Sequence, residues 1–211
     1  MILLLICSVV SATVIIWRGF ALRRKEVMPR EIQEAIDRLQ PSDTNDAVTQ
    51  LFRMVREDRS ALGKITRVGL QHLQWPKSEN HEAVQTKARH EIVRLETGLF
   101  ILEVVVGIGP LLGLLGAVSG LVTVFATLGE SATVTDPRGI ASGISEALST
   151  TIVGIAVAIP SLIAFSYFSK KIEMMASEME SLVGDLLAKC YHQQRRRVLA
   201  EEPPSSGIRV S

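Results

Sequence analysis

A single carboxylate, Glu146, stands in an uncharged stretch of the sequence that is long enough to cross a lipid bilayer. No other charged residue occurs between Gly139 and Ser169. An Asp, Lys or Arg at the centre of a transmembrane helix costs roughly 2.5–3.5 kcal/mol on insertion scales. Such a group usually persists where it faces a bundle interior, a cavity or an ion path. Glu146 is therefore a candidate functional residue that faces a bundle interior, a cavity or an ion path.

Hydroxyl side chains accompany Glu146 at helical spacing. The polar residues follow one another at i, i+3, i+4, i+7 and i+8: Ser142, Ser145, Glu146, Ser149 and Thr150. This spacing places them on one face of an otherwise apolar helix. Because lipid cannot hydrogen-bond such a stripe, it must face protein or water. Two roles stay open: an ion path, and a packing seam in which Glu146 is hydrogen-bonded between helices.

Residues 104–129 form a second stretch without charge. As a helix this stretch spans roughly 39 Å, more than the ~30 Å hydrocarbon core of a bilayer. Its glycines form two pairs with a spacing of four, Gly109 with Gly113 and Gly116 with Gly120. Such pairs let helices approach closely in a membrane, so we expect a packing seam here. Ser119, Thr123 and Thr127 add a hydroxyl stripe for which packing and pore lining are equally open.

The elements that position these residues are expected to be helical throughout, because no strand pattern stands out. The apolar N-terminal stretch precedes the basic residues 23–25, the reverse of the order in a signal peptide. It predicts a transmembrane helix whose C-terminal end is cytoplasmic. Pro160 removes one backbone hydrogen bond from the last apolar helix and predicts a kink. The fold class expected is all-α: a polytopic membrane protein with three transmembrane helices, N-terminus out and C-terminus in, and a cytoplasmic helical domain.

Apolar and charged stretches alternate along the chain and predict its division. The expected segments are a first transmembrane helix at 2–22, a cytoplasmic helical domain at 23–98, a second transmembrane helix at 99–128, a periplasmic loop at 129–138, a third transmembrane helix at 139–169, a cytoplasmic helical extension at 170–200 and a disordered tail at 201–211. The cytoplasmic domain is expected to brace the membrane helices. The alternative is a docking surface for a cytoplasmic partner.

Composition argues against several other classes of protein. The two cysteines stand far apart, and the four histidines lack metal-ligand spacing, so no disulfide framework or metal site is expected. Aromatic residues make up 5% of the chain, which disfavours a base-stacking surface for nucleic acid. Gly107-x-Gly109 follows no strand, and no hydrolase elbow motif occurs. An enzyme is therefore not expected, and no cofactor is expected beyond a coupling ion.

Two linked stretches resemble the MotA/TolQ/ExbB proton channel family. They are residues 109–121, GPLLGLLGAVSGL, and residues 143–160, GISEALSTTIVGIAVAIP. The second stretch, with Glu146, is most similar to the ExbB/TolQ branch. The resemblance is strong over about residues 105–170 and looser over most of the chain. By matching positions, it implies that Glu146 and Thr151 are polar pore residues of the third helix. The family usually has Thr in the second helix where this chain has Ala117.

The resemblance also implies a bacterial inner-membrane energiser that assembles with partners. In the family, a homo-oligomer of five such subunits surrounds the helices of a single-span ExbD/TolR-like subunit. Proton flow then drives motion of a TonB/TolA-like protein. The candidate ion path comprises Glu146, Thr151, Thr150, Ser149, Ser119 and Thr123, and the candidate packing residues are Gly109, Gly113, Gly116, Gly120 and Pro160. The coupling ion expected is H⁺, with Na⁺ left open. A MotA-like stator or gliding-motor subunit and a non-conducting scaffold are the alternatives.

Overall fold

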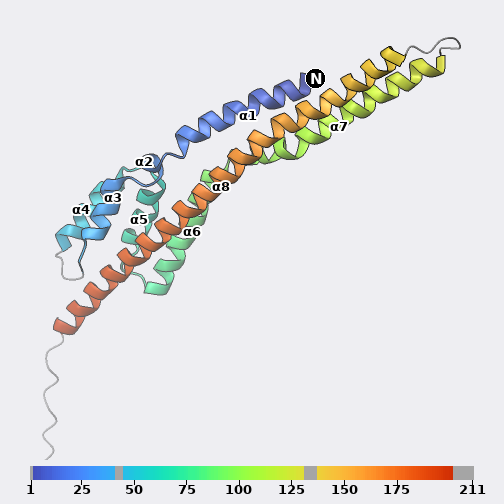
Figure 1. Cartoon of the computed structure of the whole chain (residues 1–211). Helices are drawn as coiled ribbons and strands as arrows, with labels where there is room; N and C mark the ends of the chain where they lie inside the picture. The colour runs from blue at the N-terminus through green and yellow to red at the C-terminus, as the bar shows by residue number, and fades with distance from the viewer. Residues whose placement is uncertain (1, 41–44, 131–136, 202–211) are drawn as a thin grey trace, which may run out of the picture. The chain divides into compact units, whose positions relative to one another are not determined.

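The computed structural model describes residues 2–40, 45–130 and 137–201, and these residues form helices joined by short turns without any strand. The helices, labelled in Figure 1, are α1 (Ile2–Ala21), α2 (Arg24–Val27), α3 (Arg30–Arg38), α4 (Asn45–Arg56), α5 (Ala61–Gln71), α6 (Lys77–Glu96), α7 (Leu99–Glu130) and α8 (Pro137–Glu201). The predicted all-α class is confirmed over these residues. Three predicted segments lie partly outside them, at 41–44 of the cytoplasmic domain, at 131–136 of the loop and at 202–211 of the tail.

Three of these helices are long and apolar enough to cross a membrane: α1, α7 and α8. This finding confirms three candidate spans, while their orientation stays a prediction. The apolar part of α8 is only its beginning. At 1.5 Å per residue the 65 residues of α8 extend roughly 98 Å, about three times the thickness of a hydrocarbon core. Most of α8 must therefore lie outside the hydrocarbon, while the bounds of the extension at 170–200 stay a prediction.

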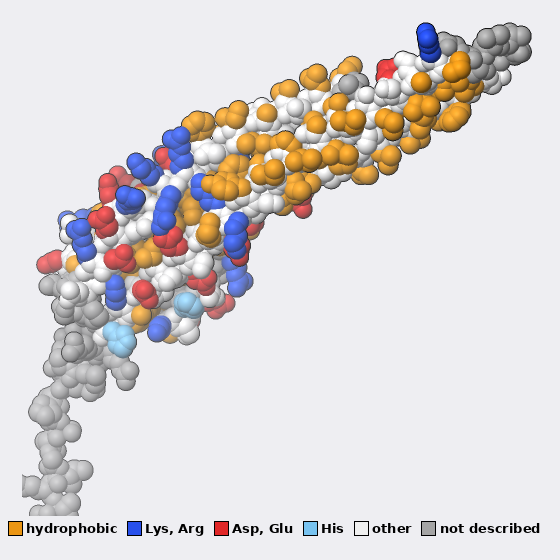
Figure 2. Space-filling model, in the orientation of Figure 1, with side chains coloured by type: hydrophobic (Ala, Val, Ile, Leu, Met, Phe, Trp, Pro, Cys, Tyr) orange, Lys and Arg blue, Asp and Glu red, His pale blue; other side chains and the backbone are white. Residues whose placement is uncertain are grey.

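The chain divides into two compact units. The first contains α1, α7 and α8 up to Lys171, and the second contains α2 to α6 with α8 from Ile172 onward. Their surfaces differ in chemistry. On the face drawn in Figure 2, hydrophobic side chains cover α1, α7 and the first part of α8, whereas charged side chains gather over the second unit. The exposed side chains of the first unit include Leu111, Phe125 and Ile163, each at least 64% exposed. Such a surface is stable in lipid and not in water.

Helix α1 packs along the other two helices of the first unit. The Ser11 hydroxyl donates to the Ser161 hydroxyl across 2.6 Å, because the Ser161 hydroxyl itself donates to the Val157 carbonyl. Both serines are buried. Arg18 is also buried and donates to the carbonyl of Thr97. A Cβ at Gly98 would lie 2.5 Å from the Arg18 guanidinium, so only glycine leaves room for this contact.

The second unit has an apolar core built around the later part of α8. Its buried residues recur at heptad-like spacing: Ile172, Met175, Met179, Val183, Leu186 and Leu187. Leu182 also follows Met179 at helical spacing, but it is only half-buried, because Val183 takes the inward position. Leu187 approaches α5 at Gly69, where a Cβ would lie 3.2 Å from the Leu187 side chain. The Lys189 ammonium donates to the carbonyl of Ile36 at 3.1 Å and ties α3 to α8.

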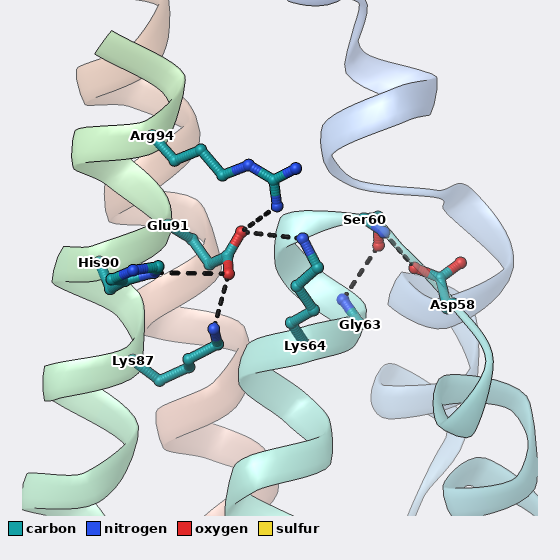
Figure 3. Close-up of polar contacts among 8 residues, drawn as sticks. All are labelled: Asp58, Ser60, Gly63, Lys64, Lys87, His90, Glu91 and Arg94. Carbon is teal, nitrogen blue, oxygen red and sulfur yellow. Dashed lines mark hydrogen bonds and ion pairs between the residues drawn. The ribbon is translucent and has the colours of Figure 1, made fainter. Parts of the chain in front are cut away.

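A buried carboxylate joins α5 to α6 (Figure 3). The Glu91 side chain is 4% exposed, and its oxygens lie 3.1 Å from Lys64 Nζ and 2.7 Å from Lys87 Nζ. Arg94 lies 3.7 Å away. Burial acts to raise the pKa of Glu91, but the hydrogen bonds from Lys87 and Lys64 together outweigh it, so the pKa is lowered. The carboxylate form is therefore the one that the folded unit holds.

We expect Glu91→Gln to destabilise the second unit by about 2–4 kcal/mol, because it leaves the part-buried Lys64 without its counter-charge. The loss should be full near neutral pH. It should shrink as the pH falls below the ordinary Glu value of 4.5 and through the lowered pKa, where the parent loses the same stabilisation. This loss of stability is measured by thermal unfolding of the variant and the parent in mild detergent at a series of pH values. Glu82→Gln, an exposed site on α6, serves as the control. Equal losses at neutral and acid pH would contradict the charge argument.

Candidate functional site

The site is built where α7 and α8 approach each other along a seam of small residues. At Gly109, an added Cβ would lie 3.2 Å from the Gly154 carbonyl. At Gly113 it would lie 3.0 Å from the Thr150 carbonyl, and at Gly120 2.9 Å from the Ala147 Cβ. The two backbones are thus nearly in contact, which is the geometry that small residues permit in membrane helices. All the predicted packing glycines lie on this seam, including Gly116, whose Cβ would meet the Thr150 hydroxyl at 2.9 Å.

A groove of about 320 Å³ opens beside this seam. It is lined from α7 by Gly116, Gly120, Thr123 and Val124, and from α8 by Gly143, Glu146, Ala147 and Thr150. The α7 residues recur at i, i+4, i+7 and i+8 and the α8 residues at i, i+3, i+4 and i+7, so each set forms one helix face. Glu146 is the one ionisable residue among these eight. The absence of side chains at three of the positions is what leaves the space.

Thr150 connects the groove to the opposite helix. Its hydroxyl lies 3.0 Å from the Gly113 carbonyl of α7 and 2.8 Å from the Ala147 carbonyl of its own helix. A carbonyl oxygen only accepts, so the single proton of the Thr150 hydroxyl is donated to one of these two carbonyls or shared between them. Thr150 and Glu146 stand one helical turn apart on the same face of α8. The structure thus brings two of the predicted ion-path residues together.

Thr123 also lines the groove, and its hydroxyl donates to the Ser119 carbonyl at 3.1 Å. Thr151 does not line the groove. It is half-buried, and its hydroxyl lies 3.3 Å from the Gly113 carbonyl, so it faces α7 of the same chain. Ser149 and Ser119 are exposed outside the groove lining, with the Ser149 hydroxyl donating to the Ser145 carbonyl at 2.8 Å. The predicted set is therefore divided between the groove, the seam and the outer surface.

Two prolines interrupt the hydrogen-bond ladders of the seam helices without ending them. Pro160 lies within α8 and Pro110 within α7. Pro160 itself is exposed, whereas the neighbouring Ser161 is buried against α1. Ala117 is buried at 5% exposure and does not line the groove.

Sequence reasoning missed the α8 half of the seam. Gly143, Ala147, Gly154 and Ala158 are small residues at i, i+4, i+11 and i+15, a periodicity that was visible in the sequence. The structure sets Gly154 against Gly109, and a Cβ added at Gly109 would lie 3.5 Å from the Ala158 Cβ. Glu146 marks the polar face of α8. The face with small residues, however, determines how closely α7 approaches. Among the described residues, no group of three or more His, Cys, Asp or Glu side chains is placed to hold a metal ion.

We expect Gly154→Ala to lower the thermal unfolding temperature of the detergent-solubilised protein. The new Cβ would lie 2.6 Å from the Gly109 carbonyl and 3.0 Å from the Gly113 Cα, and neither backbone atom can move alone. Forcing a methyl group into a closed interface costs about 1–3 kcal/mol. Gly107→Ala is the matched control on α7, because nothing lies within 4 Å of its Cβ and alanine favours the helix. Equal unfolding temperatures for both variants would refute the seam.

Comparison with known proteins places this site in a family context. A relative from Methanothermobacter thermautotrophicus, named a biopolymer transport protein ExbB homolog, is 31% identical over 131 residues, 62% of this chain and 46% of that protein. Biopolymer transport protein ExbB of Aquifex aeolicus is 31% identical over 118 residues, 56% of this chain and 78% of that protein. Biopolymer transport protein exbB1 of Vibrio cholerae is 28% identical over 160 residues, 75% of this chain and 70% of that protein.

The match to the first of these relatives spans about half of its length. The relatives carry ExbB names, as the resemblance of the Glu146 stretch to that branch implies. The family model for the MotA/TolQ/ExbB proton channel family matches residues 57–181, which is more than half of the chain. This segment contains α5, α6, α7 and the part of α8 that carries the groove. The chain therefore belongs to the MotA/TolQ/ExbB proton channel family.

Proposed function

We propose that this chain is the channel-forming subunit of an ExbB-like energiser in the bacterial inner membrane, where it couples a proton gradient to mechanical work. The observation that carries the proposal is the groove between α7 and α8, where one carboxylate, Glu146, lies between glycines and threonines in an apolar helix pair. A lone carboxylate at this depth is costly unless it binds something. Family membership supports a proton as the ion, with Na⁺ as the alternative.

The proposed mechanism uses proton binding and no covalent chemistry. Glu146 accepts a proton from one side of the membrane and later releases it to the other. Protonation removes a charge from the apolar helix, so the two states of Glu146 differ in how readily the α8 surface contacts lipid or a partner helix. That difference is what can drive motion. Thr150 and Thr123 supply hydroxyl oxygens beside the carboxylate, and the seam keeps α7 and α8 together while the charge changes.

Partners are required, because one copy exposes Glu146 and its groove on a surface that would face lipid. We propose a homo-oligomer, a pentamer as in the family, closed around a single-span ExbD/TolR-like subunit. This complex would act on a TonB/TolA-like protein and so support outer-membrane transport or envelope integrity. The names of the ExbB relatives, which are biopolymer transport proteins, favour transport over a stator role. No nucleic acid takes part.

We propose an N-out, C-in orientation, because the basic residues 23–25 follow α1 and Lys170 and Lys171 follow the apolar stretch of α8 in the sequence. Single cysteines in a background without Cys7 and Cys190 test it. A cysteine at Asp37, in the second unit, should react with a membrane-impermeant maleimide only after the inner membrane is opened. A cysteine at Arg138, at the start of α8, should react in intact spheroplasts. The reverse pattern would overturn the orientation.

We expect Glu146→Gln and Glu146→Ala to lower the activity measured in an energy-dependent uptake or envelope-integrity assay. The activity should fall to that of a strain without this chain. Both variants remove the exchangeable proton, while neutral side chains at this position favour insertion and should leave the amount of complex unchanged. Glu146→Asp keeps the acid and should keep part of the activity. Growth and uptake, with the chain quantified in the membrane fraction, measure the effect.

Glu103→Gln is the control for a charge change in the same membrane unit, because Glu103 lies on α7 outside the groove and should tolerate the change. Full activity of Glu146→Gln would contradict a channel and leave a scaffold, in which Glu146 only forms hydrogen bonds. Mass measurement of the complex from native membranes adds a second criterion. A monomer without a single-span partner would also contradict the proposal.

A further inference from the structure

A separate groove, of about 710 Å³, lies in the second unit and takes no part in the proposed ion path. We call it the Trp75 groove. Val68 of α5 and Trp75 of the following turn line it, together with four α6 residues at i, i+3, i+4 and i+7: Glu79, Glu82, Ala83 and Thr86. This spacing places the four on one face of α6. The Trp75 side chain is 46% exposed, so a large aromatic ring stands open next to carboxylates.

The Trp75 end of this groove is held in place from below. The Tyr191 hydroxyl of α8 donates to the Trp75 carbonyl at 2.9 Å, the shorter of its two carbonyl contacts. The same hydroxyl accepts from the buried Asn80 amide at 3.0 Å, and that amide also donates to the Gly69 carbonyl. The His72 ring lies against the Trp75 ring, with 3.9 Å between their centroids. The groove is therefore preformed, and α8 passes its end at Tyr191.

The charge in the groove is mostly negative. Glu79 and Glu82 are exposed and form no ion pair with another described residue. Lys87, farther along α6, lies 2.7 Å from the Glu91 carboxylate, so its charge is already compensated (Figure 3). A cation is attracted both by free carboxylates and by the face of an indole ring. The site therefore suits a basic side chain that is flanked by apolar ones.

The sequence places such a segment within reach. Residues 208–210, outside the described part of the chain, are Ile-Arg-Val, one arginine between two β-branched apolar residues. Helix α8 runs from Tyr191 past the groove to Glu201, about 15 Å farther on at 1.5 Å per residue. The seven steps from Glu201 to Ile208 span up to roughly 23 Å when extended. The tail is thus long enough to return to the Trp75 end.

We propose that residues 208–210 of the same chain occupy the Trp75 groove. Arg209 pairs with Glu79 and Glu82, and its two apolar neighbours contact the apolar wall and the indole ring. Residues 203–207, PPSSG, act as the linker, because two prolines disfavour further helix and Ser and Gly give a flexible connection. The segment would cover an exposed tryptophan, and any other protein that uses this surface would have to displace it.

Thiol labelling in the groove tests the occupant. Thr86→Cys is introduced into a chain without Cys7 and Cys190, once at full length and once ending at Glu201. The complex, extracted from its membrane in mild detergent, reacts with a polar maleimide, and the labelled peptide is quantified by mass spectrometry. The rate in the truncated chain divided by the rate in the full chain measures protection. Asp37→Cys, at an exposed site outside the groove, is the control.

We expect the truncated chain to be labelled severalfold faster at Thr86→Cys and at an unchanged rate at Asp37→Cys. The free peptide SSGIRVS should slow the labelling of the truncated chain again at about millimolar concentration, because a short flexible linker supplies an effective concentration of that order. The peptide SSGSRSS, which carries Ile208→Ser and Val210→Ser, should leave the rate unchanged.

Charge exchange tests the pairing of tail and groove. Glu79→Lys and Arg209→Glu should each lower the protection by up to about fivefold, the effect of one exposed ion pair. The double variant should regain it, because the pair is restored with its signs reversed. Comparing truncated and full chains cancels any direct effect of a new charge on the thiol. Glu57→Lys, exposed and outside the groove, should keep the parent protection.

Equal labelling of the full and truncated chains would overturn the inference, as would protection that neither charge reversal changes. A chain with Thr86→Cys and Ser211→Cys identifies whose tail is bound. A short bis-maleimide should join the two thiols within one chain, which keeps its monomer mass on a denaturing gel. A cross-linked dimer in place of this product would assign the groove to the tail of a second copy and overturn the placement.

Discussion

The close approach of α7 and α8 is the constraint on which the rest of the membrane unit depends. Gly109 and Gly154 meet backbone to backbone, and Gly113 and Gly120 repeat the contact along the helices. In a membrane, helices gain little from the hydrophobic effect, so association depends on packing and a few hydrogen bonds. Side chains at these positions would separate the helices, remove the Thr150 and Thr151 bonds to Gly113, and open the groove to lipid.

The groove follows from the same constraint. Missing side chains at Gly116, Gly120 and Gly143 create a space that an apolar helix pair would otherwise fill, and Glu146 and Thr150 lie on its wall. Small residues thus have two effects: they bring backbones together on the seam and leave volume beside it. The close approach also brings the Gly113 carbonyl within hydrogen-bond reach of the Thr150 and Thr151 hydroxyls. A membrane interior requires such bonds, because lipid offers no partner for a polar group.

Much of this arrangement could be predicted from the sequence, because the signals were strong and local. Uncharged stretches predicted the three candidate spans, and helical spacing predicted that Glu146 and Thr150 share the face of α8 that lines the groove. Which hydroxyl faces the groove could not be read in the same way. Thr150 and Thr151 differ by 100° around the helix, and the choice between groove and seam depends on where α7 lies. Similarly, Leu182 and Val183 both fit the apolar face of α8, and packing within the second unit selects Val183.

The two units use charge in opposite ways, and the difference explains their separate tasks. In the second unit, the buried Glu91 is compensated by Lys64 and Lys87, which holds it ionised and makes it a fixed structural link. In the membrane unit, Glu146 lies among groups that offer lone pairs and no described basic side chain lines its groove. A carboxylate with a fixed counter-charge keeps one protonation state, whereas one without it gains by binding a proton or cation. Under the proposed function Glu146 carries charge reversibly, whereas Glu91 is a structural link between α5 and α6.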